Sequence, residues 1–481
     1  MLWVGNGQIV RVLTTFGTVA ILARFLGPED FGVISGVVMV ALTANLVGDF
    51  GLSAAVIQRP KVDRKLLSCV FWLNITISST LAVLVAITAG QISALFQLPE
   101  MTEPLRVGAL IFPLTAVGGA WRAVLEKSLQ FRKVALAETF GTIAGSLAAI
   151  VSVVLGADIW ALVIQQLVLA GGASFAFMVA ARWMPLFFFS FSMSKSLLGF
   201  GSHLTASLLV GLMAKFIHRP VISRYLGAEA LGHYSVAVQL VDYPARNLAQ
   251  VLQRIMFPAL SKVQTDNARL RHMHRTALHG VSLIIWPIMV GLSAVSDLFV
   301  TVLMGPGWDL TAVVLSLIAP AGAIGAINGV NNTLFLAKRR PDLQLYTTSF
   351  LAVAMILGLV IGVQHGLIGV AIAHLASTVV TLPVLIALSF QQIKQPIFGT
   401  LRFIAPIFVS SGVMYASVFY LKTLLSFTSI VELAICIPAG VVVYLGTELL
   451  IDRKQIKVVL SSMKRSSANT DNASQPGLDA V

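Results

Sequence analysis

Long apolar segments alternate with short polar connections along most of the chain. The apolar segments are about 20 residues or longer, the length at which an α-helix crosses a lipid bilayer. The pattern predicts fourteen such helices, at 4–26, 31–57, 65–90, 104–128, 133–156, 158–182, 197–219, 229–255, 277–303, 309–337, 343–364, 366–390, 399–421 and 427–451. A longer basic connection at 256–275 is predicted to hold a helix on the membrane surface. We therefore expect an all-α polytopic membrane protein without a separate extramembrane domain.

The composition supports this class. Of the 481 residues, 57% are hydrophobic and only 11% are charged, which excludes a soluble domain of this length. Both cysteines, Cys69 and Cys436, lie in apolar segments. They are expected to be small buried side chains, and not a disulfide or a metal-binding pair.

Lysine and arginine are concentrated in every second connection. They gather around 59–65, 127–133, 182–195, 254–275, 338–340 and 394–402, and again in the tail from 453. The intervening connections are acidic or neutral except for Arg24, Arg219, Arg224 and Lys422. The positive-inside rule then places both termini in the cytoplasm. Loop charge of this kind accounts for the net charge of +13, so we expect no nucleic-acid partner.

A motif at 24–35 returns at 224–235. Both copies contain Arg, Leu, Gly, Glu, a second Gly and Ser in register, and we interpret each copy as a tight turn between two helices. A second echo relates 110–118 to 317–325. Copies that lie six helices apart predict two lobes in a parallel pseudo-two-fold repeat. The expected parts are a six-helix lobe at 1–182, a second six-helix lobe at 197–390, two additional helices within 399–451 and a disordered cytoplasmic tail at 452–481.

Polar side chains recur at helical spacing on four of the predicted helices. These stripes are Gln8, Arg11, Thr15 and Thr18; Asn45, Asp49 and Ser53; Ser207, Gly211, Lys215 and His218; and Ser235, Gln239, Asp242, Arg246, Gln250 and Gln253. A charged side chain at the centre of a membrane helix costs about 2.5–3.5 kcal/mol on insertion scales, so such groups face protein or water. We expect the stripes to line a wet cavity.

Structural explanations compete with this one for several residues. Asp242 and Arg246 have the i, i+4 spacing of a local ion pair. Serine and threonine often bond within their own helix, and Glu138 is the kind of residue that joins two helices. Some side chains near helix ends are expected in the head-group layer: Arg106, Arg122, Glu126 and Lys127. Arg11 and Lys215 are the strongest candidates for function, because neither has an acidic residue within one turn on its own helix.

Motifs of catalysis are absent from the sequence. It has no P-loop, no nucleophile elbow, no dinucleotide fingerprint and no cluster with metal-ligand spacing. We therefore expect no enzymatic activity, no cofactor and no metal. A membrane glycosyltransferase or polysaccharide ligase would need an acidic metal motif or a large periplasmic loop. A non-transporting scaffold would leave the polar stripes without a purpose.

Residues 22–32, Leu-Ala-Arg-Phe-Leu-Gly-Pro-Glu-Asp-Phe-Gly, resemble the opening signature of the polysaccharide-transporter flippases. These are the Wzx-like branch of the MOP exporter superfamily. Further matching segments follow in order at 49–59, 71–74, 160–163 and 257–261. The similarity covers the first twelve predicted helices and is greatest to the colanic-acid and succinoglycan type exporters.

This resemblance implies a MATE/MOP-like fold and a flippase. Such proteins move undecaprenyl-pyrophosphate-linked oligosaccharide repeat units across the bacterial inner membrane for exopolysaccharide, capsule or O-antigen assembly. They work by alternating access between two lobes, and polysaccharide polymerase or export machinery is a candidate partner. Many relatives carry Asp-Asn late in the seventh helix where this chain has His218-Arg219, so a cation-coupling role is not carried over from that position.

Both lines of inference predict a transporter of an anionic lipid-linked sugar. The predicted substrate-binding residues of the central cavity are Arg11, Asp49, Lys215, Gln239, Asp242, Arg246 and Gln250. The three cations would attract the pyrophosphate, the two acids would orient it or carry protons, and the glutamines would meet sugar hydroxyls. A cation-coupled multidrug exporter of the same fold is the alternative, which the net-cationic lining disfavours. The sugar, the coupling ion and the oligomeric state stay open.

Overall fold

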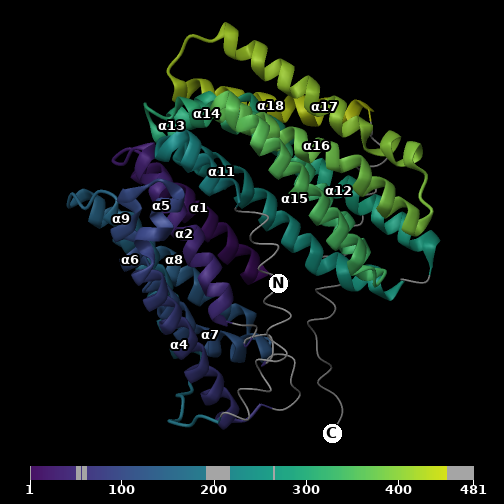
Figure 1. The fold of residues 1–481 in the computed structure, drawn as a ribbon. Helices are drawn as coiled ribbons and strands as arrows, with labels where there is room; N and C mark the ends of the chain where they lie inside the picture. Colours follow the sequence, from purple (N-terminus) through teal and green to yellow (C-terminus); the bar gives the residue numbers. More distant parts are fainter. Residues whose placement is uncertain are drawn as a thin grey trace. The chain divides into compact units, whose positions relative to one another are not determined.

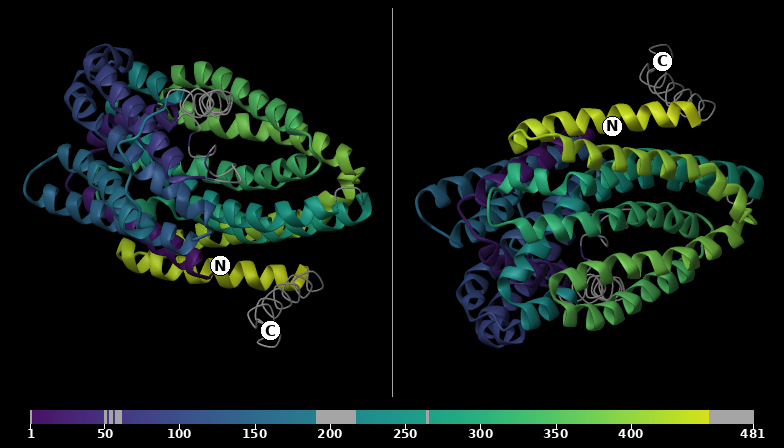
Figure 2. Two further views of the ribbon diagram at one scale, coloured as in Figure 1. Left: turned by 90° about the horizontal axis from the view of Figure 1, so that it is seen from below. Right: turned by 90° about the horizontal axis from the view of Figure 1, so that it is seen from above.

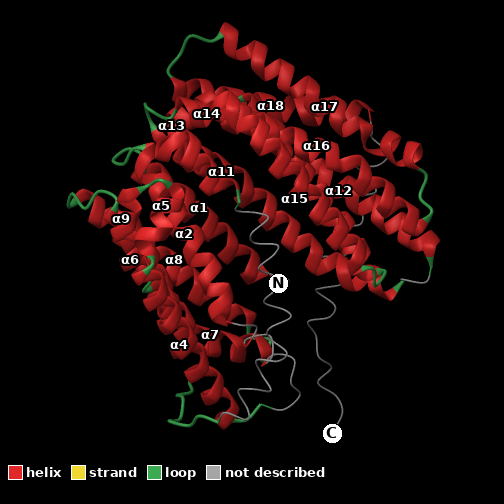
Figure 3. Ribbon diagram, in the orientation of Figure 1, coloured by secondary structure: helices red, strands yellow, loops and turns green. Residues whose placement is uncertain are grey.

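The computed structural model of the protein describes residues 2–49, 52, 56, 62–190, 217–263 and 266–451, and the regular structure within these ranges is entirely helical (Figure 3). In chain order the helices are α1 Leu2–Leu22, α2 Pro28–Asp49, α4 Arg64–Ile87, α5 Ala89–Phe96, α6 Thr102–Gly108, α7 Ile111–Lys127, α8 Phe131–Val154, α9 Trp160–Ala181, α11 His218–Lys262, α12 Asn267–Ala294, α13 Ser296–Met304, α14 Asp309–Ala337, α15 Pro341–Gly362, α16 Gly366–Ile393, α17 Ile397–Leu424 and α18 Ser429–Ile451 (Figure 1). Short 3₁₀ helices at Pro99–Met101 and Val363–His365 lie between them.

The expected class, an all-α polytopic membrane protein, is confirmed. Nine helical segments in the described part of the chain are long and apolar enough to cross a membrane. Many side chains on their outer faces are large, apolar and exposed, as a protein surrounded by lipid requires. The count of fourteen membrane helices stays a prediction.

A break between two helices was predicted after 219 and before 229, and the structure has one at Gly227, within the second copy of the repeated motif. Two helices, which together carry the label α11, meet there at a kink, and the φ of 88° and ψ of 177° of Gly227 lie outside the helical region. Glycine adopts this conformation without strain, so one helix ends and the next begins there with no loop between them. The first copy does form the expected turn, between Leu22 and Pro28.

The segment 256–275, which was predicted to hold a helix on the membrane surface, is helical at both ends but is not a separate helix. Helix α11 runs through Lys262, and α12 already begins at Asn267. Asp266 ends the connection as an N-cap, because its carboxylate accepts hydrogen bonds from the backbone N–H groups of Ala268 and Arg269. The helices α11 and α12 thus extend into the segment where a separate surface helix was expected.

The chain divides into two compact units. Unit 1 comprises residues 1–240, 303–314 and 352–373, and unit 2 comprises 241–302, 315–351 and 374–481. The lobes expected at 1–182 and 197–390 follow from the repeat in the sequence and stay predictions.

The two copies of the repeated motif pack against each other within unit 1. A Cβ atom added at Gly32 would lie 1.9 Å from the carbonyl oxygen of Ala228, and one at Gly232 would lie 1.7 Å from that of Pro28. Only glycine allows the backbones of α2 and α11 to approach so closely. The second glycine of each motif is therefore required by the contact between the copies.

Trp308 reinforces this contact from the loop before α14. Its indole N–H donates to the carbonyl oxygen of Ala23 at 3.0 Å, and its ring meets the edge of Phe31 with centroids 5.2 Å apart. The Arg219 guanidinium donates to the carbonyl oxygen of Ser35 at 2.8 Å. Side chains from two other parts of the sequence thus hold the first motif in place.

In unit 2, α17 and α18 form an antiparallel hairpin that packs against α12 (Figure 2). The Tyr444 hydroxyl donates to the carbonyl oxygen of Leu283 at 2.9 Å. Lys422 of α17 forms an ion pair with Asp297 of α13, with Nζ and Oδ1 2.5 Å apart. These helices, which lie outside the repeat in the sequence, are integral to the packing of unit 2.

A buried polar group, the histidine cluster, joins three parts of unit 2 and consists of His274, Asn331, Gln395 and Thr400. The two ring nitrogens of His274 lie 3.2 Å from Oε1 of Gln395 and 3.1 Å from Oδ1 of Asn331. The amide of Gln395 donates to the Thr400 hydroxyl at 2.7 Å, and that of Asn331 donates to the carbonyl oxygen of Ile327 at 3.0 Å. This cluster ties α12 to α14 and to the start of α17.

Candidate functional site

The structure describes the side chains of only some of the predicted cavity residues. Side chains are described for Arg11, Gln239 and Asp242, all of them partly buried. Three others lie in described helices but outside the described side chains: Asp49, Arg246 and Gln250. Lys215 lies outside the described residues altogether. The cavity that these seven side chains were expected to line therefore stays a prediction.

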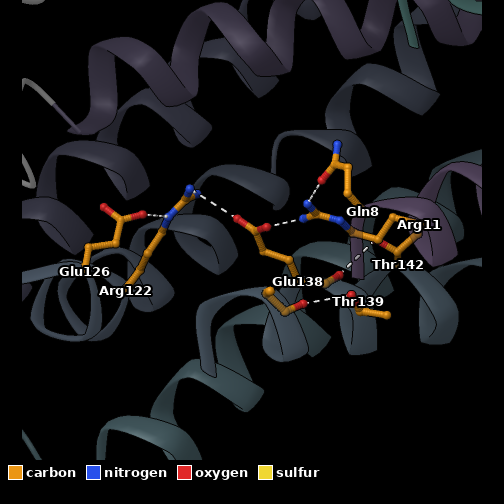
Figure 4. Close-up of polar contacts among 8 residues, drawn as sticks. Gln8, Arg11, Arg122, Glu126, Glu138, Thr139 and Thr142 are labelled. Carbon is orange, nitrogen blue, oxygen red and sulfur yellow. Dashed lines mark hydrogen bonds and ion pairs between the residues drawn. The ribbon is translucent and has the colours of Figure 1, made fainter. Parts of the chain in front are cut away.

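Arg11 is part of a charged network that we call the arginine cluster, formed by Gln8, Arg11, Arg122, Glu126 and Glu138 (Figure 4). The guanidinium of Arg11, on α1, forms an ion pair with Glu138 of α8 and donates to Oε1 of Gln8. The second carboxylate oxygen of Glu138 lies 3.2 Å from Nη2 of Arg122 on α7. Nε of Arg122 donates to Glu126 at 2.8 Å. One carboxylate thus bridges two guanidinium groups.

Helix packing brings these residues together. Gly7 lies one turn before Arg11 on the same face of α1, and a Cβ there would lie 3.5 Å from Oγ1 of Thr139 and 3.6 Å from Cβ of Ala135. Because Gly7 has no side chain, α1 lies close against α8 at this position. Glu138 of α8 projects toward α1 there. Arg122 reaches the same carboxylate from α7.

The arginine cluster lies inside apolar helices. Arg11 is close to the middle of α1, and Glu138 is two turns inside α8, a helix apolar enough to span the membrane. Their side chains are 22% and 24% exposed, whereas that of Arg122 is 49% exposed. The cluster is therefore open on one side, and its two guanidiniums are balanced by two carboxylates.

This arrangement can bind an anion by exchange of partners. A guanidinium carries five N–H donors in a planar fork, and the described contacts of Arg11 take two of them. Phosphate oxygens fit the same fork as a carboxylate. An anion that enters from the open side can therefore take the place of Glu138 on either arginine.

The sequence predicted only part of this network. Arg11 was identified as a buried cation, but its acidic partner lies 127 residues away on another helix. Glu138 was interpreted as a residue that joins helices, which it does, and the structure adds that it pairs with Arg11. Arg122 and Glu126 form the local pair that their i, i+4 spacing suggests. Thr18 bonds the carbonyl oxygen of Thr14 on its own helix and contributes nothing to the cluster.

In unit 2, Asp242 of α11 interacts electrostatically with His374 of α16. Sequence reasoning missed His374, although a histidine in the middle of the apolar segment 366–390 was a signal that could have been used. The question whether Asp242 also pairs with Arg246 lies outside the described side chains.

His218 and Arg219, which stand where many relatives carry Asp-Asn, both pack against other parts of unit 1. His218 meets the ring of Tyr234 edge-on, with centroids 5.0 Å apart, and Arg219 holds the carbonyl oxygen of Ser35. Among the described residues, no group of three or more His, Cys, Asp or Glu side chains could hold a metal ion.

Comparison with known proteins identifies relatives of this chain. The sequence profile of a family described as "Polysaccharide biosynthesis protein" matches residues 21–313. The teichuronic acid biosynthesis protein TuaB of Bacillus subtilis is 29% identical, over 84% of this chain and 84% of its own. The lipopolysaccharide biosynthesis protein WzxC of Escherichia coli is 27% identical, over 83% and 81%. The succinoglycan biosynthesis transport protein ExoT of Rhizobium meliloti is 28% identical, over 63% and 62%.

Solved structures share the fold. The lipid II flippase MurJ, in an inward closed conformation, matches with a TM-score of 0.77 at 16% identity, over 95% of this chain and all of that one. An inward-facing multidrug resistance MATE family transporter of the MOP superfamily matches with a TM-score of 0.64 at 17% identity, over 80% and 98%. At such low identity these matches show the fold alone, and they confirm the expected MATE/MOP-like architecture.

Proposed function

The chain belongs to the polysaccharide biosynthesis protein family, and from that membership we propose that it is a flippase for polyprenyl-pyrophosphate-linked oligosaccharides. Its substrate is an oligosaccharide repeat unit of exopolysaccharide, capsule or O-antigen, carried on undecaprenyl pyrophosphate. It moves this substrate across the bacterial inner membrane. The relatives named for polysaccharide biosynthesis and transport support this proposal.

The structural observation that best supports the proposal is the arginine cluster. A pyrophosphate that leaves water needs cationic partners with several donors, because its burial without them would cost several kcal/mol or more. Arg11 and Arg122 supply two guanidiniums at one carboxylate, on the open side of apolar helices. Lys215 and Arg246, predicted for the same role, would extend the cationic surface along the path.

Glu138 gives the cluster a resting state. With no substrate present, it pairs with Arg11 and Arg122, and together with Glu126 it balances their charge and keeps the cost of two cations inside the membrane low. The pyrophosphate takes its place during transport, and Glu138 recovers the arginines when the substrate departs. Partner exchange of this kind allows the head group to bind without being held permanently.

The other predicted residues complete the path. Gln239 and Gln250 meet sugar hydroxyls, and Asp49 and Asp242 orient the cations or carry protons. The polyprenyl tail stays in the bilayer while the head group passes.

Transport proceeds by alternating access between the lobes at 1–182 and 197–390, with both chain termini in the cytoplasm. A polymerase or export complex receives the repeat unit on the far side. The protein carries out no bond chemistry, a proposal that the absence of catalytic motifs from its sequence supports. A cation-coupled drug exporter of the same fold is less consistent with two arginines in a partly open membrane site.

The test is a flipping assay with the purified full-length protein in proteoliposomes. A fluorescent polyprenyl-pyrophosphate disaccharide serves as substrate, and the rate at which its label reaches the other leaflet is measured. Arg11→Ala should lower this rate about 10- to 100-fold, the value of one or two charge-assisted hydrogen bonds. Arg106→Ala is the matched control, because Arg106 pairs with Glu103 at 2.5 Å in an exposed position away from the cluster.

Equal flipping rates for Arg11→Ala and the wild type would rule out the head-group role of the cluster. Efflux of cationic dyes by the wild type, with no flipping of the lipid-linked sugar, would favour the multidrug alternative.

A further inference from the structure

The segment that follows α9 is a loop that is bound to α4 (Figure 3). We call residues 182–190, Arg-Trp-Met-Pro-Leu-Phe-Phe-Phe-Ser, the aromatic strap. Ser68 and Trp72, two positions one turn apart on α4, both bind Leu186: the Ser68 hydroxyl accepts its backbone N–H, and the Trp72 indole donates to its carbonyl oxygen, each at 2.8 Å. Arg64 donates to the carbonyl oxygen of Met184 at 3.2 Å. The strap is therefore fixed to unit 1 by its backbone.

Because its backbone is bound, the strap turns large apolar side chains outward. Phe187 is 97% exposed, Met184 56% and Phe189 53%. Trp183 lies on the inner side, where its ring faces that of Trp121 with centroids 6.2 Å apart. Three large apolar side chains in a row on an outer surface indicate contact with a non-aqueous phase or another molecule.

Exposed cations border these side chains. They are Arg64 and Lys65 at the start of α4, Lys133 at the start of α8 and Arg182 at the head of the strap. Nζ of Lys65 lies 5.6 Å from the centre of the Phe188 ring, and Nζ of Lys133 lies 3.4 Å from the carbonyl oxygen of Ala180. The neighbouring acid, Asp63, is engaged as the N-cap of α4, where it accepts the backbone N–H of Leu66. The surface around the strap is therefore apolar in the middle and positive at its edges.

We propose that the aromatic strap and these four cations bind anionic phospholipids of the cytoplasmic leaflet. Phenylalanine and methionine side chains enter the boundary between head groups and acyl chains, and the cations hold the lipid phosphates above them. The strap stands where α4 begins and α9 ends, the side of the membrane to which the positive-inside rule assigns the cytoplasm. An acidic protein would satisfy the cations but would leave the exposed phenylalanines without an apolar partner.

This inference is independent of the transported substrate. The strap leads from the last helix of the predicted first lobe toward the first helix of the second. Lipid binding at the strap fixes the depth in the membrane of the connection between the two predicted lobes. The transport rate is therefore expected to depend on the anionic lipid content.

Depth in the membrane can be measured with a single label. The two native cysteines are buried, so Phe187→Cys in the full-length protein accepts an environment-sensitive fluorophore selectively. In proteoliposomes of phosphatidylcholine with phosphatidylglycerol, the label should emit in the blue and be quenched by brominated lipid. Leu155→Cys, at the far end of α8 and 80% exposed, is the control, and its signal should not change when phosphatidylglycerol is omitted. A water-like emission at position 187 in both lipid mixtures would overturn the proposal.

Charge recognition is tested by Lys65→Gln with Arg182→Gln. These changes leave in place the hydrogen bonds that Arg64 and Trp72 donate to the strap and the one that Ser68 accepts from it. Each cation near an anionic surface contributes a factor of about five in binding, so the preference for spin-labelled phosphatidylglycerol over phosphatidylcholine should fall about 25-fold at most. An unchanged preference in the double variant would show that the cations serve membrane topology alone and would refute lipid recognition.

Discussion

The arginine cluster of unit 1 and the histidine cluster of unit 2 both place polar side chains inside apolar helices, and they differ in how their hydrogen bonds are satisfied. His274 and Asn331 are fully buried, and each polar end of the cluster meets another side chain or a backbone carbonyl. Arg11 and Glu138 are about a quarter exposed and carry full charges. The histidine cluster is closed to solvent, whereas the arginine cluster is partly open and built on full charges.

This difference separates two uses of polarity in a membrane protein. A closed, buried network joins helices strongly, because any movement would leave buried groups without partners. An open charged network can exchange one partner for another of the same sign. Only the second kind can receive a ligand, and the comparison therefore predicts that stability depends on the histidine cluster and transport on the arginine cluster.

The largest effect on stability is expected from His274→Ala. The change leaves Oδ1 of Asn331 and Oε1 of Gln395 without their partner, at a cost of about 1–3 kcal/mol each, and it adds a cavity. Thermal unfolding in detergent should shift to lower temperature, and less protein should reach the membrane. Flipping per folded molecule should be retained. Normal stability combined with lost flipping would assign His274 to transport and break the comparison.

Glu138→Gln is expected to act on turnover. The amide removes one of the two negative charges that balance Arg11 and Arg122, so the substrate pyrophosphate binds more tightly and leaves more slowly. We expect about tenfold tighter binding and about tenfold slower flipping, the size of one charge-assisted contact. Binding is measured by titration with the fluorescent substrate and turnover in proteoliposomes. Weaker binding in this variant would mean that Glu138 belongs to the binding site itself.

Arg122→Lys tests how much the planar fork matters. Lysine keeps the positive charge but cannot contact Glu126 and Glu138 in the way that two nitrogens of one guanidinium do. A loss of about three- to tenfold in the flipping rate is expected, with little change in the unfolding temperature. Full activity would show that charge alone suffices at this position.

The sequence predicted the fold class well, because membrane helices are specified by local apolar length. The family signature, residues 22–32 with the segments that follow it, was also sufficient to identify the relatives. The boundaries failed where conformation depends on single dihedral angles or on packing. Gly227 was placed within a turn of several residues, and the structure shows that two helices meet directly at this glycine, at a kink.

In the candidate site, pairs of residues that lie far apart in the sequence could not be predicted from it. Periodicity along α1 identified Arg11, yet no spacing rule connects it to Glu138, since they meet only when α1 packs on α8. The same holds for Asp242 and His374, which lie on α11 and α16. The repeated motif was recognised as a repeat, but the direct contact between Gly32 and Gly232 is a property of the folded chain.

The smallest effect on flipping and stability is expected from Gly7→Ala. This variant tests whether α1 and α8 keep the same packing around the arginine cluster throughout transport. The added methyl would lie 3.5 Å from Thr139 and 3.6 Å from Ala135, which are ordinary contacts. Alanine also favours a helix over glycine by about 1 kcal/mol, so stability should be unchanged or slightly higher. Flipping should stay within about twofold of the wild type, because the pair of Arg11 with Glu138 one turn away is preserved. Since the methyl fits the resting arrangement, a strong loss of flipping in a stable Gly7→Ala protein would contradict static packing. It would mean that α1 slides against α8 during transport, and that Arg11 leaves Glu138 by moving with its helix as well as by exchanging partners.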